Sequence, residues 1–87
     1  MNASTTTQDR HVAYILVKCE MGLEREVATS LSKIDEVAEV DIVYGTPYDV
    51  IVKVVCDTLR RLETAIWQIR RIARIISTQT MLVGTFA

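Results

Sequence analysis

Two runs of mostly apolar residues, at positions 12–19 and 48–56, constrain the fold of this chain most strongly. Each run is rich in β-branched and aromatic residues, and neither shows the clean apolar and polar alternation of a half-exposed strand. Such runs are typical of central β-strands that are covered on both faces. A chain of 87 residues has room for one domain and one core, so few elements are available to provide those covers.

The segments around these runs predict two helices and two further strands. Apolar residues recur at helical spacing in 23–34, and again in 59–73 after a favourable N-cap residue at Asp57. Segments 37–44 and 75–84 alternate instead, as strands do. The first helix buries Leu23, Val27, Leu31 and Ile34 in this interpretation, and the second buries Leu59, Leu62, Ile66, Ile69 and Ala73.

The resulting order, βαββαβ, predicts an α+β ferredoxin-like plait. In this fold an antiparallel four-stranded sheet has the strand order 4-1-3-2, and both helices pack on one face. The opposite face is then bare, and we expect it to carry some of Tyr14, Leu16, Val50, Val52, Met81 and Val83. Because soluble monomers rarely tolerate a large exposed apolar patch, we predict dimerisation through this sheet face.

The ends and the cysteines give further expectations. Residues 1–10 are polar and aperiodic, which predicts a flexible tail ahead of a domain at 11–87. This tail lacks the apolar stretch of a signal peptide or membrane span, so we expect a cytoplasmic protein with no membrane association. Cys19 and Cys56 have no Cys-x-x-Cys spacing and would fall at opposite ends of the sheet, which predicts buried free thiols.

Other proteins with this strand order have several functions whose characteristic residues are missing from this sequence. The formal net charge is −1, which gives no field that attracts nucleic acid, and the third strand has no aromatic residue at the positions where an RNA-recognition motif stacks bases. An acylphosphatase-type enzyme needs an asparagine, and the only one is Asn2. His11 has no second metal-ligating residue spaced around it. We therefore expect neither an enzyme nor a metal or other cofactor.

Four segments together resemble one family. The first strand, the glycine that opens the first helix, the hairpin with its Tyr-Asp pair and the start of the last strand are similar to the C-terminal effector domain of the Lrp/AsnC family, also called the regulation-of-amino-acid-metabolism (RAM) domain. The resemblance covers about residues 12–84. The hairpin departs in having both Thr46 and Pro47 between the glycine and the Tyr-Asp pair, where one residue is common. The matching segments are Ala13-Tyr14-Ile15-Leu16-Val17-Lys18, Gly22, Val43-Tyr44-Gly45-Thr46-Pro47-Tyr48-Asp49 and Ser77-Thr78-Gln79-Thr80.

The resemblance implies a dimer formed by sheet packing, dimers assembled into higher oligomers, and an amino acid bound between dimers in the control of transcription. In this family the ligand-binding residues come from the turn that holds the Gly and Asp residues and from the last strand. Turn amides bind a carboxylate, an aspartate pairs with an ammonium group, and threonine hydroxyls orient either. The ligand-binding residues carried over in this way are Tyr44, Gly45, Tyr48, Asp49, Thr78 and Thr80.

Simpler interpretations of the same residues stay open. Gly45 and Pro47 suit a plain β-turn, Asp49 suits the capping of a backbone amide, and the arginines of the second helix suit a solvated face or pairing between subunits. Family regulators carry a helix-turn-helix domain, whereas only about ten polar residues precede the first strand here, so we expect no direct DNA binding. Two alternative functions remain: a ligand-independent assembly module that partners full-length Lrp/AsnC regulators, and an ACT-like amino-acid-binding domain.

Overall fold

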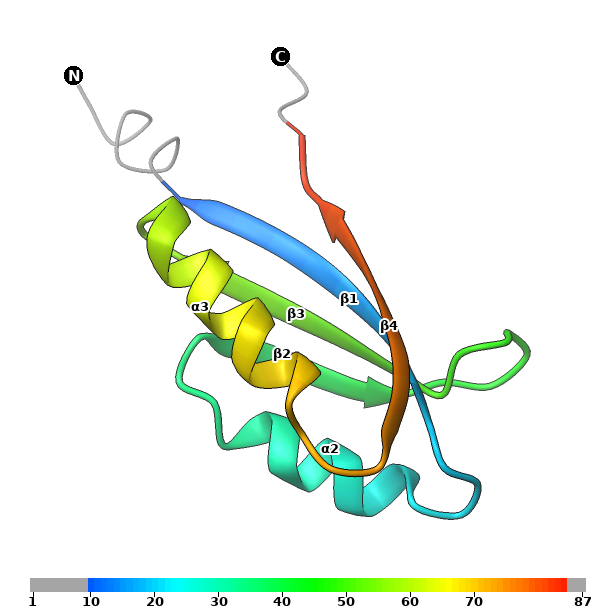
Figure 1. Cartoon of the computed structure of the whole chain (residues 1–87). Coiled ribbons are helices and arrows are strands. Elements are labelled where there is room, and N and C mark those ends of the chain that lie inside the picture. The colour runs from blue at the N-terminus through cyan, green and yellow to red at the C-terminus, as the bar shows by residue number, and fades with distance from the viewer. Residues whose placement is uncertain (1–9, 85–87) are drawn as a thin grey trace, which may run out of the picture.

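The computed structural model describes residues 10–84 and confirms the predicted ferredoxin-like order (Figure 1). Its four strands form one antiparallel sheet in the order β2-β3-β1-β4, and both helices pack on the same face of that sheet. Most of the predicted tail lies outside the described residues. The elements are β1 (His11–Cys19), α2 (Glu24–Ser32), β2 (Val37–Ile42), β3 (Val50–Cys56), α3 (Leu59–Arg70) and β4 (Ile75–Leu82).

The core lies between the two helices and the central strands. Every second residue of β1 and β3 is buried, because successive side chains of a strand point to opposite faces. Complete burial of a side chain such as Ile15 stabilises the fold by roughly 1.5–3 kcal/mol. The buried residues are Ala13, Ile15, Val17 and Cys19 of β1, Val50, Val52, Val54 and Cys56 of β3, Val27 and Leu31 of α2, and Leu62, Ala65 and Ile69 of α3.

The open face of the sheet differs from its prediction in one strand. Val50 and Val52 were expected on this face, but both are fully buried beneath the helices. Lys53 lies on the open face, with its Nζ 6.0 Å from the centroid of the Tyr14 ring. A charged side chain cannot enter the core without a partner, so Val50 and Val52, which alternate with Lys53, are on the buried face. The half-exposed apolar side chains of the open face are Val12, Tyr14 and Leu16 of β1 and Ile51 and Val55 of β3, joined by the exposed Met81 of β4.

Helix α3 begins one residue later than Asp57 would place it. Thr58 is its N-cap, and its Oγ1 accepts a hydrogen bond of 3.1 Å from the backbone N–H of Arg61. The predicted buried stripe is wrong at both ends: Leu59 is exposed in the first turn, and Ala73 is exposed beyond the end of the helix. Arg74, with a φ of 77°, then turns the chain into β4.

Arg61 fastens α3 to the turn before β2. Its guanidinium lies 2.8 Å from the Glu36 carboxylate and 3.5 Å from that of Asp57. The hydrogen bond from Arg61 lowers the pKa of the Glu36 carboxyl below its usual range. Arg61, one of the arginines for which a solvated face or pairing between subunits was expected, thus makes its ion pairs within the chain while its side chain stays exposed.

The two cysteines are buried free thiols at opposite ends of the sheet, as predicted. Burial raises the pKa of the Cys19 thiol, and the carboxylates of Asp49 and Glu24 raise it further. Burial likewise raises the pKa of Cys56. Both side chains therefore remain protonated at neutral pH. Within residues 10–84 there is no helix with the length and apolar character to cross a bilayer.

Candidate ligand site

Three segments that are distant in sequence meet at one end of the sheet (Figure 1). They are the turn after β1, the hairpin between β2 and β3, and the start of β4. The backbone N–H of Glu20 donates to the carbonyl of Arg74 (3.0 Å), which ties the first turn to the last strand, and the N–H of Asp49 donates to the carbonyl of Val17 (2.9 Å). Strand pairing therefore holds all three segments at one place.

Asp49 is half-buried at the root of this hairpin. Its carboxylate Oδ2 accepts a hydrogen bond of 2.9 Å from the backbone N–H of Cys19, so it holds the end of β1 against the start of β3. This is the amide-capping role that the sequence left open. The bond occupies one lone pair of the carboxylate, which can accept from further donors. Asp49 is thus a structural residue that also has capacity to bind a cationic group.

A hollow of about 450 Å³ lies beside Asp49 and carries groups of both charges. The Lys18 Nζ donates to the backbone carbonyl of Pro47 (3.3 Å), which places the ammonium group at the hairpin. Met21 is 96% exposed and Ile76 is 61% exposed, so both offer apolar surface to a ligand or a second subunit. The residues that line the hollow are Lys18, Cys19, Met21, Glu24, Asp49 and Ile76.

The hairpin itself carries two of the predicted site residues at its tip. Gly45 has a φ of 85°, a conformation that glycine adopts without strain. Thr46 stabilises the turn, because its Oγ1 accepts a 2.9 Å hydrogen bond from the N–H of Tyr48. Tyr44 is 87% exposed. Neither Tyr44 nor Gly45 lines the hollow beside Asp49, and both project toward solvent from the described chain.

The other predicted residues divide between the two faces of the sheet. The hydroxyl of Tyr48 donates to the Gln79 Oε1 (2.6 Å), which joins the hairpin to the open face of β4. Thr78 and Thr80 instead lie opposite Val17 and Ile15, on the helix side. Thr78 lines a second hollow of about 330 Å³ that shares Ile76 with the first. Asp49 and Thr78 thus border adjoining hollows, and Thr80 lies further along β4.

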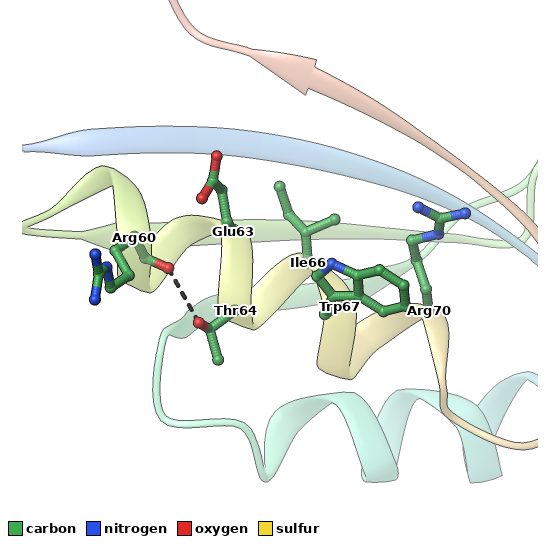
Figure 2. A pocket seen from close by; sticks show the side chains of 6 residues that line it. All are labelled: Arg60, Glu63, Thr64, Ile66, Trp67 and Arg70. Atoms are coloured by element: carbon green, nitrogen blue, oxygen red, sulfur yellow. Dashed lines mark hydrogen bonds between the residues drawn. The ribbon is translucent and has the colours of Figure 1, made fainter.

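A hollow of about 460 Å³ lies elsewhere, along the outer surface of α3 (Figure 2). The guanidinium carbon of Arg70 lies 5.6 Å from the centroid of the exposed Trp67 ring. Figure 2 shows that all six lining side chains belong to this one helix, so the hollow is an open surface and not a cleft between elements. It contains no residue of the hairpin, and we place the candidate site at the hairpin root for that reason.

A family model for the Lrp/AsnC ligand binding domain matches residues 12–84, which include both the hairpin and the hollow beside it. The chain belongs to this family. Its sequence is 43% identical to FFRP-DM1 over 85% of this chain and 99% of that one, with a TM-score of 0.78 between the structures. PHS023 of Pyrococcus horikoshii is 42% identical over 87% of this chain and 92% of its own, again with a TM-score of 0.78.

A more distant solved structure shares the fold. The regulator NMB0573 of Neisseria meningitidis, solved in complex with L-Met, is 16% identical, with a TM-score of 0.76 over 98% of this chain and 56% of its own. Comparison with curated proteins found no match. The assignment to the family therefore rests on the family model over residues 12–84.

Proposed function

We propose that this Lrp/AsnC domain is an effector domain of transcriptional regulation that binds an amino acid at the hairpin root. The observation that carries the proposal is the hollow beside Asp49, where an ammonium group, two carboxylates and apolar side chains come together within a ligand-binding family. A zwitterion needs partners of both signs, and such charge-assisted hydrogen bonds are the strong ones. The complex of NMB0573 with L-Met supports this class of ligand.

In this proposal the charged residues of the hollow bind the two charged groups of the amino acid. Glu24 and the remaining acceptor capacity of Asp49 bind the α-ammonium group, and Lys18 binds the α-carboxylate. The hollow is open on the described chain, as the exposure of Met21 indicates. A neighbouring dimer closes it, and the projecting Tyr44 and Gly45 of the hairpin provide contacts across that junction. Tyr48, Thr78 and Thr80 complete the proposed set by positioning the hairpin and β4.

Assembly through the open sheet face is part of the same proposal. The apolar residues of that face are half-exposed at the centre of a sheet whose other face is covered. Glu39 and Asp41 lie at the β2 rim, and Glu39 is the register partner of Lys53 on β3. Two such faces packed together would bury the apolar centre and leave charged residues at the rim, as in stable interfaces. We propose this homodimer as the unit from which larger oligomers form.

Ligand binding acts on assembly in this account. An amino acid held between dimers favours the oligomer whose two walls it contacts, because a ligand shifts an equilibrium only by its differential affinity for the two states. The domain would act in the cytoplasm without contacting DNA itself, with full-length Lrp/AsnC regulators as candidate partners. No enzymatic step is part of the proposal.

A ligand-independent assembly module is the second candidate, and one observation favours it. Asp49 and Lys18 both already have partners within the chain, in the Cys19 amide and the Pro47 carbonyl. A site that was purely structural would show this pattern. The ACT-like alternative is less favoured, because the family model that matches is that of Lrp/AsnC.

The two candidates differ in their response to ligand. We expect a thermal-shift screen against the twenty amino acids to show a raised Tm with one or a few of them, since a ligand at 100 times its Kd stabilises the folded state by about 2.7 kcal/mol. Lys18→Gln should abolish the rise, whereas Lys33→Gln, which removes the same charge at the end of α2, should retain it. Twenty unchanged Tm values from a stable oligomer would establish the assembly module instead.

A further inference from the structure

The outer surface of α3 exposes a large aromatic side chain. Trp67, the only tryptophan in the sequence, is 63% exposed. The buried side of the helix consists of Leu62, Ala65 and Ile69, and Trp67 lies two positions from each of the last two. Two positions turn a helix by about 200°, so the indole points away from the core. Folding buries little of this ring, and a large aromatic side chain in such a position is typical of an interaction surface.

Arginines flank this indole along the helix. Arg60 lies two turns before Trp67 and Arg71 lies one turn after it, so the three share the outer side of α3. All of them are exposed, and so is Arg70. Within residues 10–84, neither Arg60, Arg70 nor Arg71 makes an ion pair. Among the side chains that line the hollow at this surface, Glu63 is the one acid, so the surface carries an excess of positive charge.

The hollow beside the indole has a wall on one side only. It measures about 460 Å³, and all six side chains that line it come from α3 (Figure 2). The guanidinium of Arg70 stacks on the ring of Trp67, which holds both groups in place. Figure 2 shows Arg60 at the end of the hollow opposite Arg70. Pockets for small molecules enclose most of the ligand, so this open surface suits a macromolecular partner that brings the second wall.

We propose that the outer side of α3 binds an acidic segment of a partner protein that has an apolar side chain at its centre. The apolar side chain packs on the ring of Trp67. Carboxylates on one side of it pair with Arg60, and those on the other side pair with Arg70 and Arg71. Tryptophan and arginine are the residues that most often dominate the binding energy of protein interfaces, and a guanidinium group binds a carboxylate through two parallel hydrogen bonds.

The order of charges along α3 favours a protein segment over a nucleic acid. Glu63 lies between Arg60 and Arg70, which are about 15 Å apart along the helix axis. A nucleic acid has a phosphate at every nucleotide and would set negative charge opposite this carboxylate. A protein segment can place its apolar residue there instead. The formal net charge of −1 also gives no long-range attraction for a polyanion.

This surface is separate from both contacts of the proposed function and does not depend on them. Helix α3 packs on the covered face of the sheet, so its outer side stays accessible when two open faces meet (Figure 1). The hollow on α3 shares no residue with the hollow beside Asp49. Binding of a partner to α3 is therefore measurable whether or not the chain dimerises or binds an amino acid.

The fluorescence of Trp67 reports directly on this surface, because the sequence has no other tryptophan. The probe is a synthetic peptide of about 15 residues, longer than α3 itself, with glutamates toward both ends and leucine at its centre. Acrylamide should quench the indole readily in the free protein. Saturating peptide should shift the emission to the blue and reduce that quenching, whereas a peptide with lysine in place of glutamate should do neither.

Two outcomes of this experiment point to a different occupant. An indole that is already protected from acrylamide in the free protein would assign the surface to a second copy of the chain and overturn the proposal. A single-stranded DNA oligonucleotide that shifts the emission where the acidic peptide does not would assign it to nucleic acid, which also overturns the proposal.

Substitutions on α3 locate the contact, with the fluorescence anisotropy of a labelled acidic peptide as the measurement. Arg60→Glu and Arg70→Glu should each weaken binding by about tenfold or more, because each sets like charges against each other. Arg25→Glu, on the exposed surface of α2, changes the net charge equally and should retain the wild-type Kd. Trp67→Ala should weaken binding by about 30-fold, as expected of an aromatic anchor.

These variants alter exposed side chains, and circular dichroism checks that each one folds like the wild type. The same Kd for the wild type, Arg70→Glu and Trp67→Ala would overturn the proposal. It would also be overturned if the acidic peptide showed no saturable binding, or if Arg25→Glu weakened binding as much as Arg70→Glu, since the attraction would then be a property of net charge and not of this surface.

Discussion

The two faces of the sheet are built from similar residues but differ in what covers them. Ile15 and Leu16 are neighbours in β1, yet Ile15 is completely buried under the helices and Leu16 remains half-exposed on the open face. In β3, Val52 and Ile51 show the same division. Apolar residues of this chain thus fall into two groups: those on one face form the core, and those on the other face stay half-exposed and are the proposed contact for a second subunit.

The largest expected effect is a difference in the free energy of unfolding between variants of Ile15 and Leu16, the two neighbours in β1. Ile15→Ala should lower the free energy of unfolding by about 2–5 kcal/mol, because it leaves a cavity in the packed core. Leu16→Ala should cost less than about 1 kcal/mol when measured at low protein concentration, where a dimer contributes little. Urea unfolding of both variants provides the measurement. Equal losses would contradict the division of β1 into a covered and an open face.

The open face should instead determine association. Leu16→Asp should halve the mass of the sheet-face dimer, because a carboxylate would lose its solvation within an apolar interface. Its far-UV circular dichroism should match the wild type, since the side chain does not enter the core. Thr29→Asp on the exposed side of α2 is the matched control. Analytical ultracentrifugation that gives the same mass for the Leu16 variant and the control would rule out the sheet-face dimer.

A smaller loss of stability is expected from substitutions at the N-terminus of α3, which packs on the covered face. Thr58→Ala removes the side chain that caps the Arg61 amide and should cost about 1 kcal/mol, or about 4–8 °C in Tm. Asp57→Ala should cost less, because its carboxylate makes only a longer, exposed ion pair with Arg61. Thermal unfolding followed by circular dichroism decides between them. The reverse ranking would restore Asp57 as the N-cap.

The smallest expected effect is a pH dependence of the covered face. Glu36 has a pKa lowered below its unfolded value by Arg61. Its contribution to stability is therefore fully present above the unfolded pKa, about 4.3, and is lost as the pH falls through the folded pKa. Glu36→Gln should flatten this acid dependence and leave the rest of the profile unchanged. A Tm profile between pH 3 and 7 that keeps its full slope in the variant would assign the slope to other carboxylates.

Most of the fold could be predicted from the sequence because its periodic signals are local. The order of elements, the central strands and the positions of the cysteines follow from patterns within each segment. Which residues of β3 face the core was harder to predict, because every residue from Val50 to Val55 except Lys53 is apolar. Asp57 and Thr58 are both good N-cap residues, and only the hydrogen bond to Arg61 distinguishes them.

The candidate site was predictable only in part. The hairpin motif located Asp49, and the family membership is now established, but the partners of Asp49 in the hollow lie about thirty residues away in sequence. Lys18, Met21 and Glu24 reach it through strand pairing, which no local pattern encodes. Their sequence signals were weak: a lysine at the end of an apolar strand and a glutamate in a first helical turn, where such residues are common.

The position at which a bound amino acid perturbs the protein tests the proposed ligand site. We would titrate the ¹⁵N-labelled protein with the amino acid that raises its Tm most and follow the amide and indole resonances by NMR. A ligand at the hairpin root should shift the resonances of Cys19, whose N–H is bonded to Asp49, and of the neighbouring Met21 and Ile76, and leave the Trp67 indole unchanged. Shifts confined to Trp67 and its neighbours on α3, or no saturable shift at all, would contradict a ligand site at the hairpin root.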